Sequence, residues 1–247
     1  MAYPFTHINR EVYPKTFLKD VYVSLHFPKV DITDSLKDNM IRFFDEAFGV
    51  EDMPEESFEK VVFVHSKDDM IRFHFALEFV QFSVKQPAYR SFEQLAVYRD
   101  KAFKYLEVLK VREISKIIFY KYNQLNYQLK NSGTPVDVMK DVFSTSLLNN
   151  MTEEDVKSQT GLSRWEKSLC FQGEDATDSA FTIEYGFRKK SKDSEQDALT
   201  LKTQIESGNV NVKKDNVMAI LSDYNQILDN GFHWCVTPDI IKEMKKL

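Results

Sequence analysis

Residues 114–129 read Ile-Ser-Lys-Ile-Ile-Phe-Tyr-Lys-Tyr-Asn-Gln-Leu-Asn-Tyr-Gln-Leu, an unusually long run with the composition of a β-strand. At about 3.3 Å per residue, such a strand would be about twice as long as a typical one. We therefore predict that it joins two parts of the chain and serves two sheets.

The side chains of this strand alternate between two faces. One face carries Tyr120, Tyr122, Gln124 and Asn126, and the other carries Lys121, Asn123, Leu125 and Tyr127. Phenol and amide groups supply flat contact area, donors and acceptors, which suits a recognition surface. They also suit a polar network inside or between two sheets, with each amide hydrogen-bonded. The sequence leaves both interpretations open and does not show which face is exposed. The candidate binding residues are Tyr120, Tyr122, Gln124, Asn126 and Tyr127.

The segment before this strand contains strands and helices. Residues 18–27 have the period-two apolar pattern of a half-buried strand. Residues 31–48 repeat apolar side chains at helical spacing, with Asp31 as the expected N-cap and Gly49 as the left-handed terminator. Further strands are predicted at residues 60–65, 70–75 and 79–85, followed by a helix that starts near residue 91.

The polar run Ser66-Lys67-Asp68-Asp69 has the composition of a hairpin loop. A loop of this length pairs His65 with Met70 and keeps the ring of His65 away from that of His74. We therefore expect each of the two histidines to be structural or solvent-exposed.

The segment after the long strand begins with a looser region at residues 130–161, which holds one short helix near residues 136–143. Strands are predicted at residues 164–171, 180–188 and 198–206. A helix capped by Asp215 and closed by Gly231 follows, and Thr237-Pro238 opens a final short helix.

This order of elements predicts an α+β fold with two mainly antiparallel sheet-and-helix halves, ferredoxin-like or related, joined by the long strand. We divide the chain into an N-terminal half at residues 1–130, a connecting region at 131–161 and a C-terminal half at 162–247. The expected core includes Phe43, Phe44, Phe103, Leu106, Ile220 and Leu221.

Composition narrows the class of protein. The chain has 247 residues, 43% of them apolar, which excludes disordered and collagen-like classes. Its net charge of −5 has the wrong sign for a dedicated nucleic-acid binder. Cys170 and Cys235 lie in apolar runs and are expected to be unpaired thiols in a reducing cytoplasm. Neither a signal peptide nor a membrane-spanning segment is predicted.

Motifs for catalysis and cofactor binding are missing from the sequence. The seven glycines are never closer than twelve residues apart, which excludes a dinucleotide-binding G-x-G-x-x-G motif and a P-loop. The cysteines form no C-x-x-C pair, and the five histidines form no H-E-x-x-H motif. We therefore predict no catalytic residue, no metal ligand and no cofactor.

Four segments lie where predicted strands and helices begin, end or connect. They are Phe82-Ser83-Val84-Lys85, Tyr89-Arg90-Ser91-Phe92-Glu93, the strand from Ile117 to Leu125, and Phe232-His233-Trp234-Cys235-Val236-Thr237. In combination they resemble a sporadically distributed family of uncharacterised bacterial proteins, and the likeness covers nearly the whole chain. The resemblance implies an accessory role such as defence or toxin neutralisation. It implies no activity and no catalytic residue.

Two functions fit the sequence. The leading hypothesis is a non-enzymatic cytoplasmic protein that binds another macromolecule, a protein rather than a nucleic acid, through a sheet face or a groove between its halves. The alternative is a metal-independent nucleic-acid-processing enzyme that uses His26 or His74 together with Tyr120 or Tyr122. One basic cleft that gathers these side chains would favour the alternative.

Overall fold

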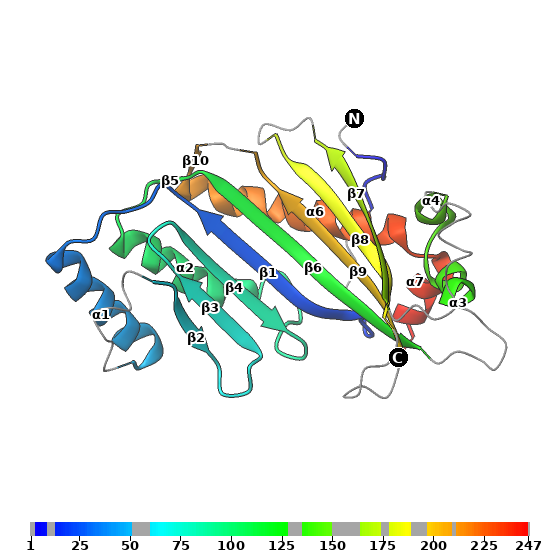
Figure 1. Cartoon of the computed structure of the whole chain (residues 1–247), viewed down its shortest axis with the longest axis horizontal. Helices are drawn as coiled ribbons and strands as arrows, with labels where there is room; N and C mark the ends of the chain where they lie inside the picture. The colour runs from blue at the N-terminus through cyan, green and yellow to red at the C-terminus, as the bar shows by residue number, and fades with distance from the viewer. Residues whose placement is uncertain are drawn as a thin grey trace.

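The computed structural model describes residues 3–8, 13–50, 60–127, 135–149, 164–173, 178–188, 197–208 and 211–246. The described strands form one eight-stranded antiparallel sheet in the order β2-β3-β4-β1-β6-β9-β8-β7, together with a small sheet of β5 and β10 (Figure 1). The predicted α+β class is confirmed, but the halves share one large sheet.

The first half contains β1 (Leu18–His26), α1 (Asp34–Phe48), β2 (Val62–His65), β3 (Ile71–Phe75), β4 (Phe79–Lys85) and α2 (Leu95–Val108). Helix α1 is capped by Thr33, whose side chain accepts a hydrogen bond from the Leu36 N–H, so the prediction of Asp31 as N-cap was wrong. Gly49 ends the helix with φ of 65°, as predicted, because glycine adopts this left-handed conformation without strain.

The second half contains β5 (Glu113–Ile114), β6 (Lys116–Tyr127), α3 (Pro135–Val142), α4 (Thr145–Leu148), β7 (Arg164–Gln172), β8 (Ala180–Arg188) and β9 (Asp197–Glu206). It ends with β10 (Val212–Lys213), the short helix η2 (Lys214–Asn216), α6 (Val217–Cys235) and α7 (Pro238–Met244). The predicted strand from Ile114 is interrupted at Ser115, whose N–H donates to the His26 carbonyl, so Ile114 pairs in the small sheet instead.

Gly231 does not end its helix, because α6 continues to Cys235. A Cβ atom at this position would lie only 2.2 Å from Cζ of Phe181. Glycine is present because the Phe181 ring packs against the helix backbone there, and the prediction of a terminator was wrong.

Strands β1 and β6 pair antiparallel at the centre of the sheet and join the two halves. Among the described residues, the first half runs as a strand, a helix, three strands and a helix. From β6 onward, the second half runs as a strand, the helices α3 and α4, the three strands β7 to β9, the short elements β10 and η2, and the helices α6 and α7. The order outward from the centre is the same on both sides, with β4, β3 and β2 beyond β1 and β9, β8 and β7 beyond β6. The boundaries predicted at residues 130 and 161 stay a prediction.

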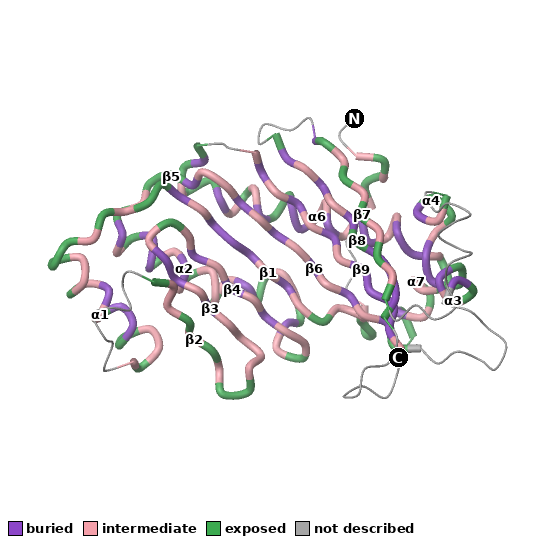
Figure 2. The backbone as a smooth tube through the Cα atoms, in the orientation of Figure 1, coloured by how far each residue is buried: buried purple, intermediate pink, exposed green. Residues whose placement is uncertain are grey.

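The core lies between the sheet and helices α1, α2 and α6. Along β1, Val21, Val23 and Leu25 are buried against these helices, and Figure 2 shows the alternation of burial along the strands. Of the predicted core residues, Phe43, Phe44, Leu106 and Leu221 are buried, whereas Phe103 and Ile220 are partly buried and pack against the core. Cys170 and Cys235 are free thiols. Within the described residues, no helix is long and apolar enough to cross a membrane.

Candidate functional site

The sheet has a second face, which we call the open face, and none of the described helices lies over it (Figure 1). Its centre is formed by alternate side chains of the two central strands. They are Asp20, Tyr22, Ser24 and His26 of β1 and Tyr120, Tyr122, Gln124 and Asn126 of β6. Neighbouring strands continue these rows outward on both sides, so the open face extends across the whole sheet.

The structure therefore distinguishes the two faces of the long strand. Tyr120, Tyr122 and Gln124 are half-buried on the open face, and Asn126 is exposed there and accepts a 2.8 Å hydrogen bond from Gln124 Nε2. On the helix side, Lys121, Asn123 and Leu125 are buried. The side chain of Tyr127 lies outside the described residues.

Two tyrosine rings stack where the two halves meet. Tyr22 of β1 and Tyr120 of β6 are opposite each other, with ring centroids 4.6 Å apart and an interplanar angle of 13°. The Tyr22 hydroxyl donates to Gln81 Oε1, and Gln81 Nε2 donates to His74 Nδ1. Desolvation raises the pKa of both tyrosines, so both hydroxyls are neutral. Sequence analysis missed Tyr22 as a site residue, because its partner on β6 is far away in the chain.

Basic side chains on the open face are paired with carboxylates. The pairs are Arg72 and Lys85 with Asp69, Lys116 with Glu206, Lys202 with Glu184, and Arg164 and Arg188 with Glu166. This arrangement leaves little positive charge uncompensated on the described part of the face.

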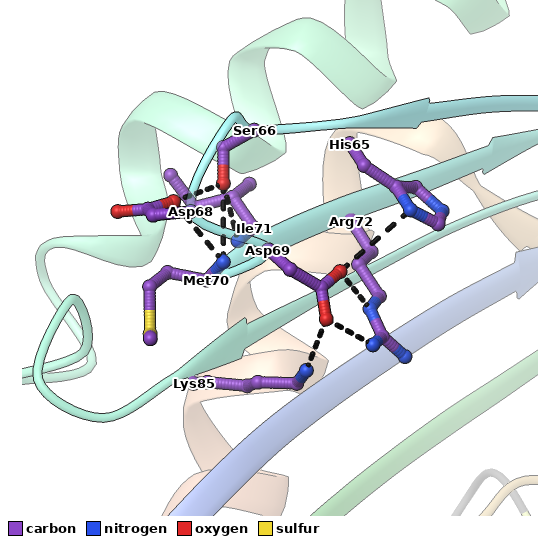
Figure 3. Close-up of polar contacts among 8 residues, drawn as sticks. All are labelled: His65, Ser66, Asp68, Asp69, Met70, Ile71, Arg72 and Lys85. Carbon is purple, nitrogen blue, oxygen red and sulfur yellow. Dashed lines mark hydrogen bonds and ion pairs between the residues drawn. The ribbon is translucent and has the colours of Figure 1, made fainter.

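The turn between β2 and β3 organises one of these ion-pair groups (Figure 3). Ser66 Oγ accepts hydrogen bonds from the backbone N–H groups of Met70 and Ile71, at 3.1 and 3.0 Å, and Asp69 adopts φ of 55°. Asp69 then accepts from Arg72 and Lys85, and these bonds hold the pKa of its carboxyl far below the ordinary range.

The same turn corrects the predicted histidine geometry. It pairs Ser66 with Ile71, so His65 lies opposite Arg72 and His74 opposite Phe63. The rings of His65 and His74 are consequently 6.0 Å apart on the open face, whereas the sequence predicted that they would not meet. The composition of residues 66–69 correctly predicted a hairpin loop, but the predicted register of β2 against β3 was wrong by two residues.

Asp20 is a carboxylate of the open face that forms no ion pair with any of the described residues. It lies opposite Lys85 on one side and Tyr122 on the other, yet its buried Oδ1 atom has no hydrogen-bond partner among the described residues. Desolvation raises its pKa from 3.8 to about 6. Lys85, the Val21 N–H and Arg72 oppose the increase in pKa, and Asp69 adds to it.

The change Asp20→Asn should stabilise the protein at alkaline pH. Because the folded-state pKa lies above the unfolded one, the contribution of Asp20 to stability is fully present below about pH 4 and is lost as the pH rises through about 6. The variant should be more stable than the parent by about 1 kcal/mol at pH 8, allowing for solvent screening, and equally stable at pH 4. Thermal melts at both pH values measure this difference. A less stable variant at pH 8 would mean that the ionised carboxylate has a stabilising partner.

The histidines named for the alternative function lie on the open face but are spread across it. His26 Nε2 is 3.0 Å from Ser24 Oγ, and desolvation and then Lys116 lower the His26 pKa. His74 lies on β3, two strands from β1, and desolvation, then His65 and Arg72, lower its pKa. Both rings are therefore mostly neutral at pH 7. Because the basic groups nearby are paired, the described residues do not form the basic cleft that the alternative requires.

A cavity of about 140 Å³ lies on the helix side, where the halves meet. Lys121 Nζ is 2.5 Å from Asp229 Oδ1, and the Tyr13 hydroxyl is 2.8 Å from His233 Nε2. These polar groups of the cavity wall contact one another, so we interpret them as structural links that join β6 and the segment before β1 to α6.

Neither a family model nor a curated protein matches the chain. The resemblance to a sporadic bacterial family therefore stays a prediction.

Proposed function

We propose that this protein is a non-enzymatic macromolecule-binding protein that engages a protein partner through the open face. The observation that carries the proposal is the stacked pair Tyr22 and Tyr120, half-buried at the centre of a face that the described helices leave uncovered. Rigid aromatic side chains supply large contact area at low entropic cost and are enriched at protein interfaces.

The charges of the open face favour a protein over a nucleic acid as the partner. Binding to a phosphate backbone gains its affinity from cations that replace condensed counterions. The cations here already neutralise carboxylates, as Lys202 does with Glu184 at 3.2 Å. A protein surface with polar groups of both signs is the better match. The free thiols Cys170 and Cys235 support a reducing compartment, and we place the protein in the cytoplasm.

Tyr122→Ala should weaken binding of the partner with little change in melting temperature. The side chain is half-buried on the open face, so it offers contact area to a partner while contributing little to the core. Loss of an aromatic anchor commonly costs about 2 kcal/mol of binding free energy. The matched control is Val97→Ala on the exposed surface of α2, which is 62% exposed. Titration calorimetry with the identified partner measures the binding free energy of both variants, and thermal melts measure their melting temperatures.

The partner can be identified by photo-crosslinking from a single position. A photoreactive amino acid at Thr182, half-buried on the open face, should capture one specific protein in the native host. The same amino acid at Val97 should capture none. Equal capture from both positions, or none from Thr182, would contradict the proposed surface.

A nuclease assay addresses the alternative function. We expect the purified protein to leave RNA and DNA intact in the presence of a chelator. Metal-free cleavage that His74→Ala abolishes would favour the enzyme hypothesis instead.

A further inference from the structure

Asp20 differs from the other carboxylates of the open face in its partners. Asp69, Glu184 and Glu206 each lie within ion-pair distance of a lysine. No such pair involves Asp20 among the described residues, and its Oδ1 atom is both buried and without a hydrogen-bond donor there. A buried polar atom without a partner is costly, so native proteins rarely keep one without a reason.

The neighbouring cations do not satisfy Asp20 because they bind Asp69. Arg72 forms two hydrogen bonds to the Asp69 carboxylate, through Nε and Nη2, and Lys85 Nζ lies 2.8 Å from Asp69 Oδ2 (Figure 3). The turn geometry holds Asp69 in that position. Asp20 thus lies beside positive charge and the Val21 N–H, but among the described residues it forms no ion pair and its Oδ1 atom accepts no hydrogen bond.

The side chains around Asp20 suit a cation. Tyr122 is opposite Asp20 on β6, and the stacked rings of Tyr22 and Tyr120 form the next row of the face. Aromatic rings attract ammonium and guanidinium groups through their electron-rich faces. The protein already uses one of these rings in this way, because Lys202 Nζ lies 5.0 Å from the centre of the Tyr120 ring.

We propose that Asp20, flanked by Tyr122 and Tyr120, is the position at which the open face binds a basic side chain, a lysine ammonium or an arginine guanidinium, of its protein partner. This inference rests on the proposed function and specifies the chemistry of the partner. The carboxylate accepts charge-assisted hydrogen bonds from the cation, and the Tyr122 ring opposite Asp20 contacts the aliphatic stem of the bound side chain. An acidic side chain would be repelled by Asp20 and Asp69 at the same place.

The proposal has a consequence for pH dependence. Asp20 is faced by Lys85 on β4, Arg72 on β3, Asp69 in the β2–β3 turn and the two tyrosines of β6. A cation binds only the ionised form of Asp20, whose pKa is about 6. Because about a tenth of the carboxylate is ionised one pH unit below its pKa, affinity should fall about tenfold between pH 7.5 and pH 5.

A short peptide tests the site without knowledge of the partner. The probe is Ac-Gly-Lys-Gly-NH₂, titrated into the full chain at pH 7.5 while NMR follows the Asp20 carboxyl carbon and the tyrosine rings. We expect saturable shifts at Asp20, Tyr120 and Tyr122 with millimolar affinity. The Nε-acetylated peptide, which has the same shape without the charge, should bind at least tenfold more weakly.

Two variants complete the test. Asp20→Asn should abolish the shifts at the tyrosines and remove the pH dependence, whereas Glu206→Gln, a paired carboxylate on the same face, should retain both. Equal binding of the acetylated peptide, retained binding by Asp20→Asn, or no saturable shift with the lysine peptide would each overturn the inference. If crosslinking from Thr182 succeeds while Asp20→Asn binds the captured partner normally, only this inference fails. If crosslinking fails, the proposed function fails.

Discussion

Phe44→Ala is expected to lower the free energy of unfolding by about 3–5 kcal/mol. The Phe44 side chain is fully buried in α1, and its ring contacts those of Phe75 at 5.2 Å and Tyr105 at 6.1 Å between centroids. Truncation removes apolar burial and leaves a cavity between α1, β3 and α2. A small shift does not close this cavity, because β3 is held in the sheet and both helices pack against it. Chemical denaturation monitored by circular dichroism measures the loss.

The matched control for this experiment is Phe63→Ala. Phe63 is also a phenylalanine of the first half, but it is 61% exposed on β2. Its truncation should change stability by no more than about 0.5 kcal/mol. Equal losses in both variants would contradict the described core.

Lys121→Ala is expected to destabilise the protein by about 2–4 kcal/mol, because it leaves Asp229 without its nearest cation in a mostly buried place. The side chains of Lys121 and Asp229 are 9% and 26% exposed, and the pair links the central strand β6 to α6. Breaking a buried pair by removing one partner is costly, since the remaining charge keeps its desolvation penalty.

The control for the ion pair is Lys242→Ala. Lys242 pairs with Asp239 in α7, but these side chains are 73% and 84% exposed. Its removal should leave the melting temperature unchanged. The double variant Lys121→Met with Asp229→Asn should recover part of the stability that Lys121→Ala loses. A double variant that is less stable than Lys121→Ala would mean that the charges of Lys121 and Asp229 themselves stabilise the contact between β6 and α6.

Local patterns predicted the strands and helices well, because alternation and helical spacing depend on near neighbours. The period-two pattern of residues 120–126 placed Tyr120, Tyr122, Gln124 and Asn126 on one face, and the structure agrees. The helix at residues 31–48 was predicted with its glycine terminator, although its N-cap was misplaced by two residues.

Contacts between distant segments could not be predicted in the same way. The stack of Tyr22 on Tyr120 depends on the pairing of β1 with β6, and the need for Gly231 depends on the ring of Phe181. Among the described residues Asp20 forms no ion pair, and its two neighbouring cations, Arg72 and Lys85, bind Asp69 in the β2–β3 turn. Each of these features follows from tertiary geometry that no single segment encodes.

The strands follow the same order outward from β1 and from β6, so the sheet has a pseudo-twofold axis that passes through the pair Tyr22 and Tyr120. Rotation about this axis exchanges Asp20 with Ile118, and Lys85 with Glu206. The backbone frame is therefore symmetric, like that of a fused dimer, while its chemistry is not. Among the described residues, a carboxylate outside an ion pair lies beside the tyrosines on the Asp20 side of the axis, whereas Glu206 and Glu184 on the other side are paired with lysines. A partner that binds this unpaired carboxylate can therefore dock in one of the two orientations that the backbone frame alone would permit.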